Sequence, residues 1–303
     1  FQIPFLRKIK RLPKLQFGHH KALSILRKRM LPALFGVSVS QINLLVDTMI
    51  ASTLIAGSVS WLYYSDRLLE LPLALIGIAL ATVALAKLSN YHAKKDTKNF
   101  INTIDKALLY AILLGLPACA GLVLLSEELI ITLFQYDAFD ALSAKKTSLS
   151  LQAYGSGLMA FIAIKIFAPI FLSRGDTKTP VKAGVVAMVS NIALNLILVQ
   201  YFDHVGLAAA TSISALINAA ILYFFLIRQS IFRFHITFYK MLVKVIFAVT
   251  IMSLYIYYFD SSIGLYLESS LIERSILISK TITISIAIYF LTLYTLGVRL
   301  KQL

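Results

Sequence analysis

Long apolar runs constrain the fold of this chain more than any other feature. Residues 71–86 are free of charge, and apolar runs of roughly 20 residues recur along the chain. Such runs predict membrane-crossing helices, whereas barrel strands would alternate apolar and polar residues over about 10 positions. Composition agrees, since 59% of the residues are hydrophobic and 14% are charged, against about 25% charged in soluble domains. We therefore predict an all-α polytopic membrane protein.

The runs predict eight membrane-spanning helices. The second begins with Trp61, Tyr63 and Tyr64, a pattern typical of an aromatic belt at a membrane interface. Residues 128–135 are apolar but too short to span, and we interpret them as an interfacial helix or an extension of the third span. The predicted spans lie near 31–55, 61–86, 107–126, 149–172, 182–201, 206–227, 240–259 and 274–297.

Basic residues gather on one side of the predicted membrane. With the first residue in the cytoplasm, the inner segments hold 23 of the 29 Lys and Arg, and the outer segments hold eight acidic residues. This distribution predicts that both ends of the chain are cytoplasmic. It explains the formal net charge of +15 without a nucleic-acid partner. Residues 1–29 are interpreted as a basic cytoplasmic lead-in that lies near anionic lipid.

Three charged residues interrupt the start of the second span. Asp66, Arg67 and Glu70 fall in its first two turns, where a charge costs several kcal/mol unless it faces a wet cavity or a partner. An Arg67–Glu70 pair would lower that cost and serve only the structure. The other interpretation is a cavity-facing guanidinium, oriented by Asp66 or Glu70, that binds an anionic substrate such as a phosphate. Pro72 is expected to free a backbone carbonyl and bend this span.

Polar residues inside other spans suggest a second site. Asn43 and Asp47 are four residues apart and share a helix face, as do Asn191 and Asn195, and Thr211 follows on the sixth span. Their oxygens suit a small monovalent cation, or a protonation switch at the carboxylate. Plain hydrogen bonding between helices, worth about 0.6 kcal/mol for each bond, is the structural alternative.

Other residues give weaker indications. Lys165 lies about two turns from the inner end of the fourth span, where it either snorkels to the interface or faces a cavity and the substrate. Cys119 is the only cysteine, which excludes an internal disulfide and a thiolate metal site. No Walker A motif is present, so nothing in the sequence indicates an ATPase or another enzyme.

Several stretches together resemble the lipid II flippases of the MurJ (MviN) family, within the multidrug/oligosaccharidyl-lipid/polysaccharide exporter superfamily. The resemblance covers roughly residues 30–230. Two of its motifs are long and occur in order: W-x-Y-x-x-D-R-L-x-E-x-P from Trp61 and R-x-D-T-[RK]-T-P-V from Arg174. It also includes LPALFGVSVSQINLLVDTMIAS (31–52), DAFD (137–140) and GLAAATSISALINA (206–219).

The resemblance implies a fold of fourteen helices: two six-helix lobes around a cavity, then a final pair beside a lipid groove. Residues 30–230 would be the second lobe and 231–303 the final pair, with six helices expected before Phe1. The family moves the undecaprenyl-pyrophosphate-linked peptidoglycan precursor across the bacterial inner membrane by alternating access, without a required cofactor. Asp66, Arg67 and Glu70 would contact the substrate, and some members bind sodium at the positions of Asp47, Asn191, Asn195 and Thr211.

Two positions depart from the family pattern. Ala86 stands where a proline is common, and Asn195 is neutral where a carboxylate would serve a cation better. The sequence leaves two other functions open. One is another exporter of the superfamily, either a drug/cation antiporter or a polysaccharide-lipid flippase, and the other is a membrane scaffold that binds partners without transport.

Overall fold

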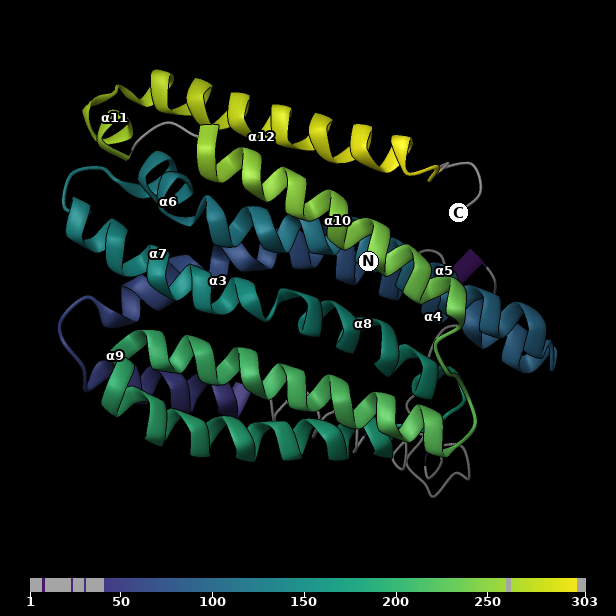
Figure 1. Cartoon of the computed structure of the whole chain (residues 1–303). Helices are drawn as coiled ribbons and strands as arrows, with labels where there is room; N and C mark the ends of the chain where they lie inside the picture. Colours follow the sequence, from purple (N-terminus) through teal and green to yellow (C-terminus); the bar gives the residue numbers. More distant parts are fainter. Residues whose placement is uncertain (1–6, 9–22, 24–29, 31–40, 260–262, 299–303) are drawn as a thin grey trace.

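The computed structural model describes residues 7–8, 23, 30, 41–259 and 263–298. The secondary structure of these residues is helical, without a strand, and the helices form a bundle (Figure 1). The lead-in predicted for 1–29 and the first part of the span predicted for 31–55 lie almost wholly outside them. After a helical stretch at 41–52 come α3 (Ser58–Pro72), a π-helical segment (Leu73–Ile78), α4 (Ala79–Ala93), α5 (Thr97–Leu124), α6 (Ser126–Phe134), α7 (Ala141–Ser156), α8 (Leu158–Ser173), α9 (Lys178–Arg228), α10 (Ile236–Phe259), α11 (Ile263–Glu268) and α12 (Leu271–Thr295).

Carboxylate caps fix where two of the helices begin. Asp96 accepts a hydrogen bond from the backbone N–H of Asn99 at 3.1 Å and starts α5. Asp140 accepts one from the backbone N–H of Ser143 at 2.8 Å and starts α7. Both caps stabilise the charged carboxylate. The Asn99 side chain lowers the pKa of Asp96 most, and the backbone N–H of Ser143 is the largest cause of the lowered pKa of Asp140.

The long helix α9 is a hairpin of two antiparallel arms. The chain reverses at Asp203, where φ is 50° and ψ is −134°, and each arm of about 25 residues is long enough to cross a membrane. Gly206 lies so close to the first arm that an added Cβ would overlap the backbone carbonyl of Leu198. The arms can therefore meet here only because residue 206 has no side chain. Figure 1 shows them running side by side.

The span predicted at 61–86 is one continuous helical stretch, Ser58–Ala93, disturbed near its middle. The π-helical segment begins directly after Pro72, which cannot donate the backbone hydrogen bond that a regular α-helix needs there. The π-helix after Pro72 was not predicted, and the predicted bend stays a prediction. α4 and α5 extend together beyond the rest of the bundle (Figure 1).

The fourth predicted span consists of two helices. α7 and α8 meet at Gly157 with a bend of 42°. An added Cβ at Gly157 would lie 2.9 Å from the Cα of Ser212, so the second arm of α9 packs against the bend. The backbone N–H of Gly157 bonds to Tyr154 instead of continuing the regular helix, and the carbonyl of Ala153 accepts from the hydroxyl of Ser212 at 2.7 Å. The bend was not predicted, and the span predicted near 149–172 stays possible as one bent span.

Among the described residues, five helices are long and apolar enough to cross a membrane, or six if α7 and α8 form one bent span. Counting both arms of α9 raises this to seven, and the first predicted span is described only from residue 41. The total of eight therefore stays a prediction. α6 is a separate short helix after Leu125, which excludes the alternative of an extended third span. α11 was not predicted.

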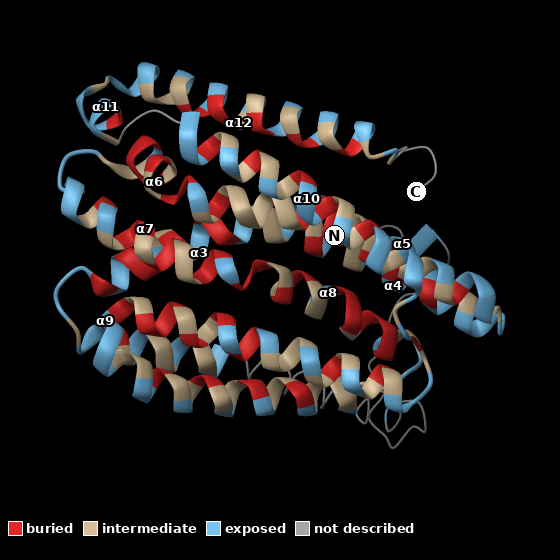
Figure 2. Ribbon diagram, viewed as in Figure 1, coloured by how far each residue is buried: buried red, intermediate tan, exposed pale blue. Residues whose placement is uncertain are grey.

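Burial follows the pattern of a protein surrounded by lipid. Buried residues gather along α3, α7 and α8 in the interior of the bundle (Figure 2). Large apolar side chains within spans are exposed instead, including Val83, Val189 and Phe247, which are 55%, 58% and 54% exposed. Water would oppose that arrangement and lipid favours it. α10 packs on α5 and on α12, so the last two long helices form a pair along one side of the bundle (Figure 1).

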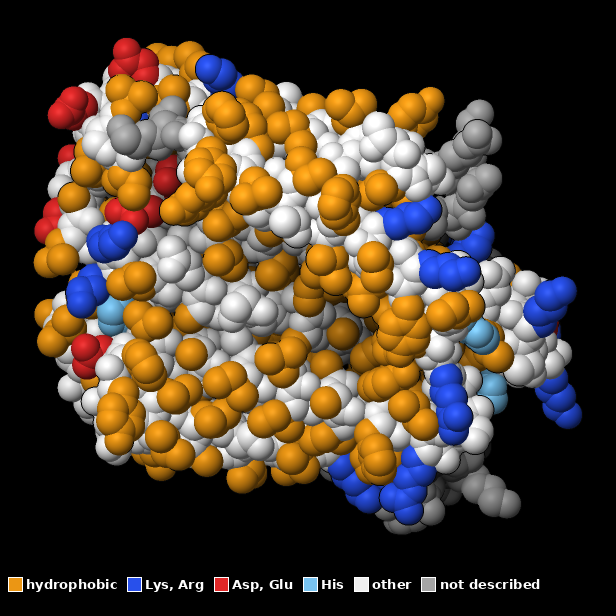
Figure 3. Space-filling view, in the orientation of Figure 1, with side chains coloured by type: hydrophobic (Ala, Val, Ile, Leu, Met, Phe, Trp, Pro, Cys, Tyr) orange, Lys and Arg blue, Asp and Glu red, His pale blue; other side chains and the backbone are white. Residues whose placement is uncertain are grey.

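The two ends of the bundle differ in charge. On the face shown in Figure 3, Lys and Arg dominate the end where α4 meets α5, and Asp and Glu gather at the opposite end, near α6 and α11. This separation matches the one drawn from the sequence, although which end is cytoplasmic stays a prediction. We call these the basic end and the acidic end.

The aromatic residues at the start of α3 differ in exposure. Tyr63 is 54% exposed, but Trp61 is only 6% exposed and packs against His204 of α9, with 4.9 Å between the ring centroids. Trp61 is therefore an interior residue that does not face lipid, while the membrane interface at this level stays a prediction. Its burial depends on α9, which is distant in the sequence.

Candidate functional site

The structure brings together the four residues predicted to bind a cation. Asp47 lies on the helix at 41–52, Asn191 and Asn195 on the first arm of α9, and Thr211 on the second arm. Asn195 Nδ2 donates to Asp47 Oδ1 at 2.5 Å and to Asn191 Oδ1 at 2.9 Å. Thr211 Oγ1 donates to Asp47 Oδ2 at 3.5 Å. We call this group the polar cluster.

Asn43 also belongs to this cluster, through Asn191. If the amide of Asn191 is turned, its Nδ2 donates to Asn43 Oδ1 at 2.8 Å and to Asp47 Oδ1 at 3.1 Å, and its oxygen accepts from the Thr211 hydroxyl at 3.2 Å. The turned orientation satisfies more of the amide's hydrogen-bonding groups. The i,i+4 spacing of Asn43 and Asp47 had indicated that the two side chains share one face.

The donor set of the cluster suits a small monovalent cation in composition. It offers one carboxylate together with amide and hydroxyl oxygens, and Asn191 and Asn195 are fully buried. Asn195 Oδ1 is buried without a hydrogen-bond partner among the described residues. In the orientation described, however, Asn195 presents its nitrogen to Asp47. Its amide must turn before its oxygen can join Asp47 as a ligand.

A cavity of about 650 Å³ lies beside the polar cluster, between α8, α9 and the helix at 41–52. Asn43 and Thr211 line it, and so does Lys165 from α8. Lys165 is exposed, and its side chain passes the π-helical segment at Gly77, where an added Cβ would lie 3.5 Å from its Cγ. The structure thus places Lys165 at a cavity, in line with the cavity-facing interpretation of the sequence, and its contact with a substrate stays a prediction. The cavity wall is otherwise mostly apolar.

Arg67 and Glu70 form an ion pair on α3. Arg67 Nη1 lies 2.6 Å from Glu70 Oε2, and their side chains are 52% and 53% exposed. The guanidinium also lies over the ring of Tyr63, with its carbon 4.9 Å from the ring centroid. Glu70 occupies only one guanidinium nitrogen in this pair. The ion pair of the structural interpretation is therefore present. The guanidinium is also half exposed, as the substrate-binding interpretation requires.

Asp66 occupies a different position from its neighbours. It is partly buried, and it is close enough to Asp47 and to Tyr154 to interact with both electrostatically. Of the two carboxylates expected to orient Arg67, Glu70 makes the contact at ion-pair distance. The lining of the cavity beside Lys165 includes none of Asp66, Arg67 and Glu70, so the structure does not gather the four predicted substrate residues around that cavity.

A second cavity, also of about 650 Å³, is almost entirely apolar. It lies between the π-helical segment, α5, α6, α10 and α12, and leucine, isoleucine and proline side chains dominate its wall. Pro72, Pro117 and Tyr289 are part of this wall. The phenol of Tyr289 donates to the carbonyl of Leu113 at 2.6 Å and so ties α12 to α5. Such a cavity suits a hydrocarbon chain.

Sequence reasoning missed two residues that hold the site in place. The hydroxyl of Ser65 on α3 bonds to the carbonyl of Thr147 on α7 at 2.8 Å. His204 Nε2 lies 3.1 Å from the carbonyl of Lys146 and joins the α9 hairpin to α7. Serine and histidine within apolar segments were the available signals, but neither has a spacing that points to its partner.

The comparisons decide the family. The sequence model of the family described as "Lipid II flippase MurJ" matches residues 1–277. The chain belongs to the MurJ family. A Vibrio cholerae protein named "Probable lipid II flippase MurJ" is 42% identical over 304 residues, which cover 100% of this chain and 58% of the relative. A Haemophilus influenzae protein of the same name is 41% identical over 310 residues, covering 100% of this chain and 61% of the relative.

Solved structures agree on the fold. A structure described as "Lipid II flippase MurJ, inward closed conformation" superposes with a TM-score of 0.73 at 28% identity, over 95% of this chain and 58% of that one. An outward-facing MATE family transporter of the MOP superfamily gives a TM-score of 0.60 at 18% identity, over 78% of this chain and 56% of that one, and supports the fold alone. The chain spans about 60% of the length of the MurJ relatives that it matches.

Proposed function

We propose that this chain is the part of a lipid II flippase that contributes one wall of the transport cavity and the groove for the lipid tail. The relatives named above are described as lipid II flippases. The observation that carries the proposal for this chain is the half-exposed Arg67–Glu70 pair on a membrane-spanning helix. A guanidinium at that exposure is costly against lipid and becomes favourable against an anionic head group.

The proposed division of labour follows from the two kinds of cavity. The pyrophosphate and its sugars would pass the Arg67–Glu70 pair with neighbouring Asp66 on α3 and, at a separate place, Lys165 beside the first cavity. The prenyl tail would stay in the apolar cavity between α5, α10 and α12, whose wall holds hydrocarbon but no fixed charge. Rocking of the lobes would then expose the head group to each side in turn.

Arg67 would neutralise phosphate charge where water is scarce. Its planar fork matches two phosphate oxygens at once, and Glu70 keeps the guanidinium oriented through a single nitrogen. The bound anion would compete with Glu70 for that nitrogen. Arg67 therefore both binds the substrate and changes its ion pair during transport.

The polar cluster is proposed to hold sodium in a part of the transport cycle. Asp47, Asn191, Asn195 and Thr211 would supply the oxygens, after the Asn195 amide turns. A bound cation would supply positive charge next to the buried carboxylate. The residues themselves connect the helix at 41–52 to both arms of α9, so the packing of those three segments would respond to cation binding.

A growth assay tests the proposal. Arg67→Ala and Arg67→Lys are introduced into the full-length protein, and each variant is asked to replace the only functional copy of the flippase in a bacterium. Both are expected to fail, because lysine keeps the charge but lacks the fork. Arg228→Lys is the matched control, since Arg228 is exposed at the basic end of α9, and it should support growth. Normal growth with Arg67→Ala, at equal protein level in the membrane, would refute the proposal.

The membrane orientation is proposed from the charge separation. The basic end would face the cytoplasm of the bacterial inner membrane and the acidic end the outer side. A cysteine introduced at Ser230 should be protected from an impermeant thiol reagent in intact cells. One introduced at Asp137 should be labelled.

A further inference from the structure

We propose that a pocket at the acidic end binds an organic ammonium group, a function separate from lipid transport. The pocket has a volume of about 530 Å³ and lies between the start of α3, the end of α6 and the loop that leads into α7. We call it the aromatic pocket. Its lining consists of Gly57, Ser60, Trp61, Tyr64, Leu133, Phe134, Tyr136, Asp137, Ala138, Phe139 and Ser143.

Five of the eleven residues in this wall are aromatic. The ring centroid of Tyr64 lies 4.7 Å from that of Phe134 and 5.3 Å from that of Phe139, the second pair being edge-to-face. Tyr136 adds a ring that is 45% exposed, and its hydroxyl is bonded to the Thr132 carbonyl at 2.7 Å. That bond fixes the position of the ring at the mouth of the pocket. Tyr64, Phe134 and Phe139 pack on one another, and the parts of these rings that remain free border the pocket together with Trp61 and Tyr136. Aromatic rings attract cations.

Charge complementarity points to the same ligand. Asp137 is exposed at the rim, and no Lys, Arg or His lies within ion-pair distance of it among the described residues. The lining contains no basic side chain. The nearby Lys145 is already paired with Glu127 at 2.6 Å, which reduces its repulsion of a cation. The pocket thus presents a single negative charge beside aromatic rings, at the acidic end of the molecule.

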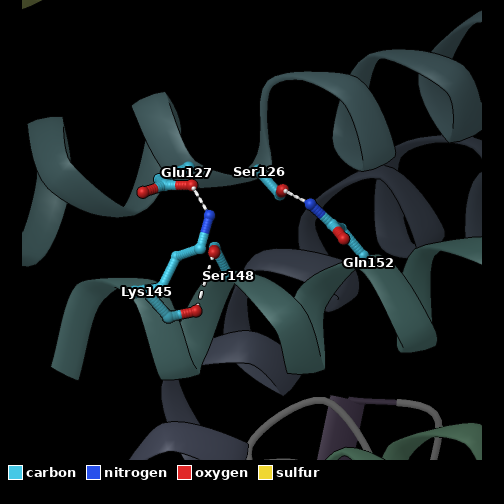
Figure 4. Close-up of polar contacts among 5 residues, drawn as sticks. All are labelled: Ser126, Glu127, Lys145, Ser148 and Gln152. Atoms are coloured by element: carbon cyan, nitrogen blue, oxygen red, sulfur yellow. Dashed lines mark hydrogen bonds and ion pairs between the residues drawn. The ribbon is translucent and has the colours of Figure 1, made fainter. Parts of the chain in front are cut away.

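The pocket is held in shape by contacts outside it. Figure 4 shows α6 tied to α7 by the Lys145–Glu127 pair and by the Gln152–Ser126 hydrogen bond of 2.9 Å. Trp61 is held between Gly57 and His204, since an added Cβ at Gly57 would lie 2.7 Å from the indole. A pre-formed wall loses little entropy when a small ligand binds.

An ammonium group fits better than the other small ligands. An anion would meet Asp137 and no cation, and a hydrocarbon chain would leave that carboxylate unused. A quaternary or primary ammonium uses both the rings and the charge. Two sources share this chemistry at the surface of a membrane: the head group of a zwitterionic phospholipid and a free amine in solution.

Trp61 offers a direct readout, because it is the only tryptophan in the 303 residues. The chain is purified in a detergent without a maltoside head group. Its tryptophan fluorescence is followed while choline chloride is added, with sodium chloride at equal ionic strength as the reference. A saturable change in emission is expected. Asp137→Asn should weaken choline binding about fivefold, and Tyr136→Leu by a similar factor, whereas Tyr136→Phe should weaken it less, because it keeps the ring and loses only the bond to the Thr132 carbonyl.

Two matched controls separate this site from general effects. Glu268→Gln removes an exposed charge outside the lining, and Tyr257→Leu removes an exposed ring from α10. Both should bind choline as the parent chain does. A second arm compares nanodiscs of phosphatidylcholine and of phosphatidylglycerol. A change in Trp61 emission that depends on phosphatidylcholine and is lost in Asp137→Asn assigns the site to the lipid head group, and saturation by choline in detergent assigns it to a free amine.

The proposal is overturned if choline produces no saturable change in detergent and the two nanodiscs give equal emission. It is also overturned if Glu268→Gln weakens binding as much as Asp137→Asn does, because the effect would then belong to the whole acidic end. Equal binding of maltose would assign the pocket to neutral sugars instead. None of these outcomes depends on whether the chain takes part in lipid transport.

Discussion

Replacement of Gly206 by alanine should open the α9 hairpin. A Cβ at this position would overlap the carbonyl group of Leu198 on the other arm. A flexible side chain could move away, but a helix backbone can relieve the overlap only if the two arms separate. Asn191 and Thr211 lie on these same arms and are hydrogen-bonded to each other at 3.2 Å. The substitution therefore disturbs the polar cluster as well as the packing.

The expected magnitude follows from three contributions. Overpacking in a rigid interior costs about 1–3 kcal/mol. Weakening of the hydrogen bond between the arms adds about 0.6 kcal/mol, the usual value inside a membrane. Alanine gains about 1 kcal/mol over glycine in helix propensity, which partly offsets both. The net loss in the free energy of unfolding should be about 0.6–2.6 kcal/mol.

Gly184 provides the matched control on the first arm of α9. An added Cβ there meets no atom within 4 Å, so Gly184→Ala should be neutral or slightly stabilising. Unfolding can be followed with a thiol-reactive fluorophore in detergent, because Cys119 is the only cysteine and is partly buried in α5. Gly206→Ala should become reactive several degrees below both the parent chain and Gly184→Ala. Equal melting of the two variants would refute the argument that backbone contact fixes the hairpin.

Two further predictions concern α7. Gly157→Ala should destabilise the chain, because its Cβ would lie 2.6 Å from Ser212 Oγ. Adding Ser212→Gly to the same chain should recover part of the lost stability in thermal unfolding. Additive effects of the two substitutions would contradict this prediction. Asp140 has a lowered pKa in the folded chain, so its contribution to stability is present above the ordinary value of about 3.9 and is lost as the pH falls through the folded pKa. Asp140→Asn keeps a cap without a titrating group. In this variant, hydrogen exchange of the Ser143 backbone amide should no longer speed up as the pH falls. An unchanged pH dependence of the exchange rate would exclude Asp140 as the titrating group.

The sequence predicted best what helix geometry decides locally. The i,i+4 spacing of Asn191 and Asn195 placed both amides on one face, and apolar length placed that face inside a membrane-spanning helix. Packing of the helix at 41–52 against the two arms of α9 brings Asp47 and Thr211 to the same face. The ion pair of Arg67 with Glu70 is likewise a contact between residues three apart on one helix.

What the sequence did not predict depends on contacts between distant segments. The bend at Gly157 requires Ser212, whose hydroxyl bonds to a carbonyl that the break frees. Glycine in an apolar run does not by itself distinguish a bend from close packing. The burial of Trp61 requires His204 in the same way, and an aromatic residue near a helix end is equally typical of a membrane interface.

The two predicted sites are connected more closely than their positions in the sequence suggest. Thr211 belongs to the polar cluster and also lines the cavity beside Lys165. At the other side of the cluster, Asp47 interacts electrostatically with Asp66, which precedes Arg67 on α3. Polar groups inside a membrane protein are costly unless they face one another or water. Two neighbouring carboxylates repel each other when both are charged, so Asp47 and Asp66 do not meet that requirement by themselves, and a cation bound in the polar cluster would stabilise both.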